Sequence, residues 1–191
     1  MSAPPPYPRI PHLVAGRGTR DDKVLTAREV AALLSGEVVV EEKLDGANVV
    51  LWSEDGIVRA GLRGGPGSAD RAGQLGPLRA WVAGRHDALV GLLGDGEALY
   101  AEWLYLTHTV AYDRLPTLLF ALDLRLGDGS LVPIEERDGR AGAAGLAVPP
   151  ELWRGVPGSV AAVEDLLGPS RYGPGPAEGV VVRATGGSGQ M

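Results

Sequence analysis

The chain has 191 residues, of which 45% are hydrophobic and 22% charged, and this is enough for one globular domain with a sizeable core. The absence of cysteine excludes disulfide scaffolds, cysteine nucleophiles and cysteine-based zinc sites. A formal net charge of −6 argues against nucleic-acid binding through overall positive charge. Binding in a local basic groove remains possible.

No apolar run reaches the roughly 18 residues that a membrane helix needs, and the start MSAPPPYPRIP lacks the apolar core of a signal peptide. We therefore expect a soluble, cytoplasmic protein. Only two of the 18 basic residues are lysines, Lys23 and Lys43. Because the other 16 basic residues are arginines, each lysine is a candidate for a role that arginine cannot fill.

The first third of the chain predicts a lead-in, a helix and a meander. Five prolines in residues 1–20 predict an extended lead-in packed against the domain. A capping box of Thr26 and Glu29 begins a short helix, which Gly36 ends. Three β-branched runs then predict an antiparallel meander, with strands at 38–42, 48–52 and 57–62.

The remainder predicts further strands and helices without an internal repeat. Apolar residues at helical spacing favour one helix over 77–93, and a Gly/Ala/Pro-rich loop is expected at 139–150. A short apolar run surrounds Leu152. The other expected elements are strands at 98–104, 118–126, 131–134 and 179–183 and a helix at 160–167. The fold class that follows is α+β, with mainly antiparallel sheets and flanking helices.

Lys43 opens the segment KLDGAN between two predicted strands. Asp-Gly is a favoured tight turn, so a simple hairpin with a solvated lysine explains this segment as well as a reactive amine does. The tetrapeptide KLDG alone does not separate the two interpretations.

Several other segments accompany it in a fixed order. They are YPRIPHL (7–13), EEKLDGAN (41–48), LRGGP (62–66), YAEWLYLTHTVAYDRLP (100–116), LLFALDLR (118–125), ELWRGV (151–156) and EGVVVR (178–183). Together they resemble the ATP-dependent RNA ligases, which share the covalent nucleotidyltransferase superfamily with DNA ligases and mRNA capping enzymes. The resemblance implies a single adenylyltransferase domain over 1–191, of the ATP-grasp-like ligase adenylation type.

The resemblance implies a lysine nucleophile. Lys43 would attack the α-phosphate of ATP and release pyrophosphate, and AMP would pass to a 5′-phosphate RNA end that is then sealed to a 3′-hydroxyl. Arginine cannot replace Lys43 in the first step because it keeps its proton at any working pH. The carboxylates of Glu41, Glu42 and Asp45 would stabilise the ammonium form, so Mg²⁺, the triphosphate and nearby arginines are needed as a counterweight.

The resemblance also assigns nucleotide contacts. Asn48 would bind sugar or phosphate, Arg63 phosphate oxygens and Glu102 a ribose hydroxyl, while Glu178 would face Lys43 or the metal ion. Each has an ordinary alternative: a turn asparagine, a loop arginine, a salt-bridged acid or a strand-capping acid. The remaining implied contacts are Glu42 at the adenine edge, Leu44, and Leu119.

Leu119 stands where the family usually has an aromatic residue stacked on adenine, and alternation predicts that Phe120 lies on the opposite face. The family's final, lysine-bearing motif is a second departure. The chain ends 13 residues after Glu178 without a lysine there, so we expect a domain truncated at its C-terminus.

The expected cofactors are ATP and Mg²⁺, and the expected partners are RNA ends, with no membrane and no obligate protein partner. One alternative is a truncated or degenerate member that binds nucleotide or RNA ends without catalysis. Another is a DNA ligase or a capping-type nucleotidyltransferase. His108 and Tyr112 are interpreted equally well as nucleic-acid contacts or as packing residues, and the tryptophans are more consistent with the core than with a stacking platform.

Overall fold

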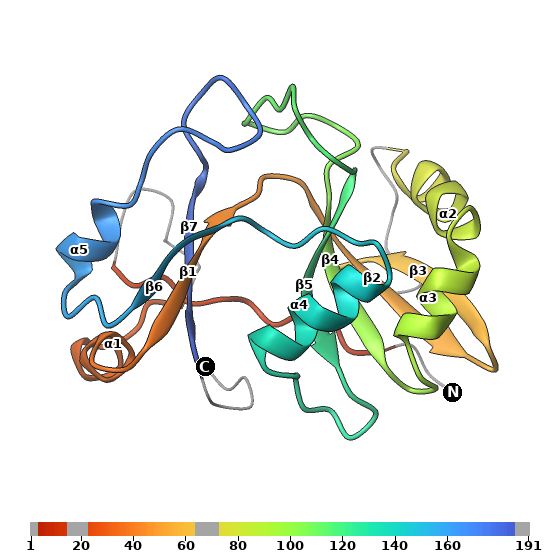
Figure 1. The fold of residues 1–191 in the computed structure, drawn as a ribbon, viewed down its shortest axis with the longest axis horizontal. Coiled ribbons are helices and arrows are strands. Elements are labelled where there is room, and N and C mark those ends of the chain that lie inside the picture. Colours follow the sequence, from red (N-terminus) through yellow and green to blue (C-terminus); the bar gives the residue numbers. More distant parts are fainter. Residues whose placement is uncertain (1–3, 15–22, 64–72, 186–191) are drawn as a thin grey trace.

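The computed structural model describes residues 4–14, 23–63 and 73–185, and its strands form two antiparallel sheets (Figure 1). The three-stranded sheet has the order β6-β1-β7, and the four-stranded sheet has the order β3-β2-β4-β5. The strand bounds are β1 (Val38–Lys43), β2 (Ala47–Glu54), β3 (Ile57–Leu62), β4 (Ala98–Trp103), β5 (Leu119–Arg125), β6 (Glu151–Gly155) and β7 (Gly179–Ala184).

Helices flank both sheets (Figure 1). The smaller sheet packs against α1 (Ala27–Leu34) and α5 (Val160–Glu164) in one apolar cluster. The larger sheet packs against α2 (Leu75–Ala83), α3 (His86–Leu92) and α4 (Ile134–Ala143) in the main core. This α+β architecture confirms the predicted fold class. No helix of the described residues is long and apolar enough to cross a membrane.

The expected meander is only partly correct. β2 and β3 form the predicted hairpin, but β1 lies in the other sheet, where it pairs with β6 and β7. The chain therefore crosses from one sheet to the other at residues 44–46, and the hairpin interpretation of KLDG is wrong. The partners of β1 lie more than a hundred residues away, so the local turn signal cannot reveal this crossing.

Further boundaries differ from the expectations, and the helix expected over 160–167 already ends at Glu164. The helix expected over 77–93 is two helices, α2 and α3, which are separated at Gly84 and Arg85. The expected strand at 131–134 is reduced to one bridge from Leu131 to Arg125. The loop expected at 139–150 begins inside α4, which the sequence hides because its segment is highly charged and contains two glycines. The capping box of α1 is confirmed.

The N-terminal lead-in packs against the larger sheet, as predicted, over its described residues 4–14. The ring of Tyr7 lies against that of Tyr100, with 4.9 Å between centroids. The Tyr100 hydroxyl donates to the Pro5 carbonyl oxygen at 2.9 Å. In Figure 1 the segment passes from the larger sheet across to the smaller one, where Leu13 packs. The rest of the predicted lead-in, 15–20, lies outside the described residues.

Candidate functional site

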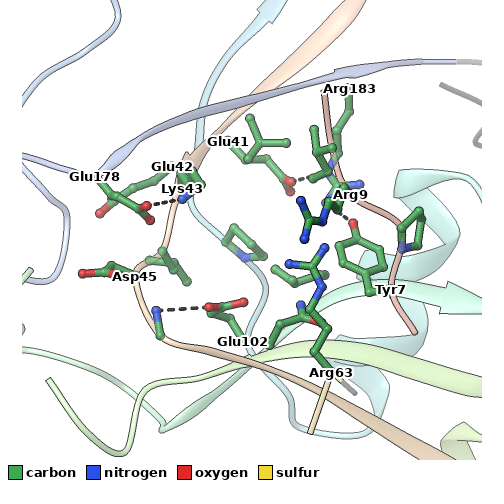
Figure 2. A pocket seen from close by; sticks show the side chains of 18 of the residues that line it. Tyr7, Arg9, Glu41, Glu42, Lys43, Asp45, Arg63, Glu102, Glu178 and Arg183 are labelled. Carbon is green, nitrogen blue, oxygen red and sulfur yellow. Dashed lines mark hydrogen bonds and ion pairs between the residues drawn. The ribbon is translucent and has the colours of Figure 1, made fainter. Parts of the chain in front are cut away.

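A pocket of about 630 Å³ is lined by both sheets and by the N-terminal segment (Figure 2). Its lining residues are Tyr7, Pro8, Arg9, Ile10, His12, Glu41, Glu42, Lys43, Leu44, Asp45, Gly46, Asn48, Arg63, Glu102, Leu122, Pro149, Glu178, Val181 and Arg183. Every predicted site residue except Leu119 is among them. In Figure 2, Lys43 lies with Glu178 and Asp45 toward one end, and Arg9 and Arg183 lie toward the other.

Lys43 is the last residue of β1 and pairs in register with Gly179, the first residue of β7. This register places Glu178 beside it, and the Lys43 Nζ donates to Glu178 Oε1. The lysine side chain is 47% exposed, so an incoming molecule can reach its amine. Two of the predicted site residues, Lys43 and Glu178, therefore lie in direct contact.

Glu42 lines the pocket, but other groups occupy its buried carboxylate. The Ser170 hydroxyl donates to Oε1 at 2.6 Å, and the Arg171 backbone N–H donates to Oε2 at 2.9 Å. The side chain therefore holds the loop before β7 against β1. Each carboxylate oxygen thus already accepts one hydrogen bond from this loop.

Asp45 turns toward the segment after β4. Its Oδ2 accepts backbone N–H groups from Thr109 at 2.5 Å and Val110 at 2.7 Å. Its own backbone N–H donates to the Tyr112 hydroxyl at 2.7 Å, and burial raises the pKa of Tyr112 to about 12. His108 Nδ1 lies 3.8 Å from Asp45 Oδ1. These contacts give Tyr112 a structural role and fix the crossing next to Lys43, whereas His108 is exposed.

Glu102 and Asn48 occupy paired positions on β4 and β2. Glu102 Oε1 accepts the Gly46 backbone N–H at 3.1 Å. Burial raises the pKa of Glu102 to about 7, against the lowering effect of hydrogen bonds from Asn48 and Gly46. Asn48 Oδ1 is buried and has no hydrogen-bond partner among the described residues. A buried acceptor without a partner lowers stability, and a ligand that donates a hydrogen bond to it would remove this penalty.

The raised pKa of Glu102 predicts a pH-dependent effect of Glu102→Gln. Its ordinary value is 4.5, so the folded state holds the proton more tightly and loses stability as the pH rises from about 4.5 to about 7. The neutral amide removes this loss and can still accept the Gly46 N–H. Urea unfolding should show Glu102→Gln more stable relative to wild type at pH 8 than at pH 5, by about 2 kcal/mol. An equal difference at both pH values would contradict the shift.

Arg63 follows β3, is exposed and lines the pocket, and its backbone N–H donates to the Asn48 carbonyl oxygen at 3.0 Å. This bond places the start of the LRGGP segment beside β2. Residues 64–66 of that segment lie outside the described residues.

A buried ion network links the two sheets on the arginine side of the pocket. Glu41 of β1 accepts from Arg183 Nε at 2.6 Å and from Arg137 Nη2 of α4 at 2.5 Å. Arg183 Nη1 also reaches both oxygens of Asp123 on β5, at 3.0 and 2.9 Å. Burial raises the pKa of Tyr7 far above its usual range, so its phenol keeps its proton and donates to Asp123.

The predicted contacts did not include this network. The sequence does carry a signal for it in two of the quoted segments, LLFALDLR and EGVVVR, where Asp123 interrupts and Arg183 follows an apolar run. A charge in such a place calls for a buried partner. The pairing itself joins residues 60 to 142 positions apart and needs the fold.

Two loops meet next to Lys43, one bound to Asp45 and the other to Glu42. The backbone N–H groups of Asp113 and Arg114 donate to the Tyr172 carbonyl oxygen, at 2.9 and 3.1 Å. Gly173 lies so close to the Ala111 carbonyl that a Cβ at this position would overlap its oxygen. The loop after β4 and the loop before β7 are thereby fixed to each other.

This contact predicts that Gly173→Ala destabilises the protein by about 1–3 kcal/mol, since the backbone has to shift to make room. Gly175→Ala is the matched control, because a Cβ there meets nothing within 4 Å. Thermal unfolding of both variants checks the difference. Equal melting temperatures would show that the loops adjust freely.

Comparison with known proteins shows the family to which this chain belongs. The family model described as RNA ligase matches residues 36–190. The chain belongs to the RNA ligase family. No curated protein sequence matches it. Among solved structures, it is similar to a Naegleria gruberi RNA ligase with PPi, at TM-score 0.62 and 16% identity, over 83% of this chain and 49% of that one.

Mutants of the same Naegleria gruberi ligase give similar matches. One with ATP and Mn has TM-score 0.63 and 15% identity, over 86% of this chain and 50% of that one. One with AMP and Mn has TM-score 0.61 and 15% identity, over 82% and 49%. Identities this low support the shared fold. This RNA ligase family chain spans about half the length of the structures it matches.

Leu119 does not lie where the resemblance implied. Its side chain is fully buried in the main core, on the face of β5 away from the pocket, and the pocket is lined by Leu122. A β-bulge between β4 and β5 pairs Tyr100 with Asp123 but Ala101 with Ala121, so that Leu122 is the extra residue. Alternation does place Phe120 on the other face, where it packs with Leu44.

Metal binding by this RNA ligase family chain would depend on few protein ligands. The described residues contain no group of three His, Asp or Glu side chains that could hold an ion. Mg²⁺ commonly binds through one or two carboxylates together with substrate phosphates, and Glu178 in the pocket fits that pattern.

Proposed function

We propose that this chain is an adenylyltransferase of the RNA ligase type, with Lys43 as the nucleophile. The observation that supports this most is the exposed Lys43 amine in a pocket between two sheets, paired with Glu178. It is the only lysine among the residues that line this pocket in the described part of the chain.

Lys43 Nζ would attack the α-phosphorus of ATP. A nitrogen–phosphorus bond forms, and the bond to the β-phosphate oxygen breaks, so that pyrophosphate leaves with the electron pair. The ammonium must first lose a proton, and Glu178 Oε1 is the acceptor bonded to Nζ. Mg²⁺, when bound with the nucleotide, would neutralise phosphate charge.

The other lining residues divide by chemistry. Glu102 and the unpartnered Asn48 Oδ1 would accept ribose hydroxyl groups, and Arg63 would donate to phosphate oxygens. Leu122 and Val181 come from different sheets and supply apolar surface for the base. We therefore assign the base contact to Leu122 in place of Leu119.

The remaining two steps would transfer and release AMP. An oxygen of the RNA 5′-phosphate attacks the phosphorus of lysyl-AMP, and Lys43 leaves as the amine. The RNA 3′-hydroxyl then attacks the 5′-phosphate, and AMP departs as the strand is sealed.

The test is to incubate the protein with Mg²⁺ and ATP labelled at either the α- or the γ-phosphate. We expect α-label on the denatured protein, no γ-label, and transfer of the α-label to 5′-phosphate RNA. Parallel reactions with GTP and with DNA ends examine the capping-type and DNA ligase alternatives. Absence of covalent label from either nucleotide would overturn the proposal and favour a non-catalytic nucleotide- or RNA-end-binding protein.

A further inference from the structure

The N-terminal segment lines the arginine end of the pocket and is held in place on both sides of Arg9. On one side, the buried Tyr7 hydroxyl donates to Asp123. On the other side, the His12 backbone N–H donates to the Lys23 carbonyl oxygen at 2.9 Å. Arg9 lies between these two anchors, is exposed and lines the pocket. The fold therefore holds its backbone at the pocket wall and leaves its side chain open to solvent.

Strand register shows how far this end of the pocket lies from the nucleophile. Arg183 pairs with Val39 of β1, four residues before Lys43, which corresponds to about 13 Å along the strand. Arg183 Nη2 donates to the Tyr7 hydroxyl at 3.5 Å, so the segment that carries Arg9 lies at the Arg183 end. In Figure 2, Lys43 and Arg9 accordingly lie toward opposite ends of the pocket.

Arg63 reaches the same space from the larger sheet. It follows β3 and is exposed, and Figure 2 shows its side chain and that of Arg9 pointing toward each other. No carboxylate of the described residues pairs with Arg63. Two guanidinium groups in this arrangement repel each other, and an anion bound between them would remove the repulsion. Arg183, by contrast, is already bonded to Glu41 and Asp123.

The stereochemistry of the proposed reaction indicates which anions would lie there. The attacking and the leaving group at phosphorus lie in line, on opposite sides of the phosphorus atom. Lys43 Nζ attacks in the first step, so pyrophosphate leaves on the side away from Lys43. In the second step Nζ is the leaving group, so the RNA 5′-phosphate enters from that same side. Both phosphate groups would therefore lie toward Arg9 and Arg63.

We propose that Arg9 and Arg63 form one phosphate site, which holds the pyrophosphate in the first step and the RNA 5′-phosphate in the second, an inference that rests on the proposed function. A guanidinium group binds phosphate through paired N–H donors and stays charged at every working pH. Because the two ligands use the same site, pyrophosphate has to leave before the RNA 5′-phosphate can bind. Arg9 thereby gives the N-terminal segment a binding role in addition to its packing.

The first test is isothermal titration calorimetry with inorganic pyrophosphate in buffer that contains Mg²⁺. Arg9→Ala and Arg63→Ala should each weaken binding by about tenfold to a hundredfold, the range for one lost hydrogen-bonded charge. Arg9→Lys should lose less, because it keeps the charge without the paired donors. Arg28→Ala is the matched control, since it changes the net charge equally but lies exposed on α1, away from the pocket residues. It should bind like wild type.

The second test compares two single-stranded RNAs of one sequence, with a 5′-phosphate or a 5′-hydroxyl and fluorescein at the 3′ end. Fluorescence anisotropy should show that wild type binds the phosphorylated RNA more tightly and that excess pyrophosphate abolishes this preference. Arg9→Ala should lose most of the preference while its binding of the hydroxyl RNA stays within about twofold of wild type. A general structural defect would weaken binding of both RNAs equally.

Absence of pyrophosphate binding by wild type, or binding unchanged in both alanine variants, would overturn the phosphate site. A loss confined to one of the two ligands would overturn its shared use. Covalent labelling of wild type by ATP is measured in parallel, and its absence defeats the proposed function whatever Arg9 does. Label on wild type together with unchanged pyrophosphate binding in Arg9→Ala and Arg63→Ala defeats the phosphate site alone.

Discussion

Lys43→Arg is expected to lower covalent labelling by ATP by roughly a thousandfold or more, although it keeps the positive charge beside Glu178. Guanidinium holds its proton at every working pH and offers no lone pair to phosphorus. Lys43→Ala should lose the label equally. The measurement is the fraction of denatured protein that carries the α-phosphate label under saturating ATP and Mg²⁺.

The chain provides a matched control, since its only other lysine is Lys23. Lys23 is exposed and does not line the pocket, so Lys23→Arg should label like wild type. Both arginine variants should unfold at the same temperature as wild type. Label on Lys43→Arg, or its loss in Lys23→Arg, would assign the nucleophile to a different group.

Local signals predicted most of the secondary structure but not the assembly of the sheets. The capping box gave α1, and alternating β-branched runs gave β1 to β3 within one or two residues. The sheet to which β1 belongs depends on pairing with β6 and β7, which follow more than a hundred residues later. A favoured Asp-Gly turn therefore suggested a hairpin where the chain crosses between sheets.

The site shows the same division. The quoted segments identified four residues that line one pocket: Lys43, Glu178, Glu102 and Asn48. Strand register brings Asn48 and Glu102 together there. Leu119 was misplaced because one bulged residue in β5 puts it on the opposite face from Asp123, four residues along the strand, and no residue type in LLFALDLR marks that bulge.

The ion network around Glu41 also escaped the sequence, yet it has the largest expected effect on stability. Its carboxylate is 2% exposed and faces two arginines, one of which also binds Asp123 on the opposite sheet. Burying these charges costs desolvation free energy, so the intact network stabilises the fold little more than apolar residues of the same volume would. Removing one carboxylate leaves the two buried arginines with less compensating charge, and the loss of unfolding free energy arises from this.

Glu41→Ala should therefore lower the free energy of unfolding by about 3–5 kcal/mol in urea titrations. The control lies opposite it on the next strand: Glu151 pairs with Glu41 in register, but its ion pair with Arg154 is exposed. Glu151→Ala should cost less than about 1 kcal/mol. Replacing Arg137 by Met in the Glu41→Ala background should recover part of the loss, because it removes a buried charge that has lost its buried carboxylate partner and keeps only the exposed Asp138. Equal effects of Glu41→Ala and Glu151→Ala would mean that the sheets are joined by apolar packing alone.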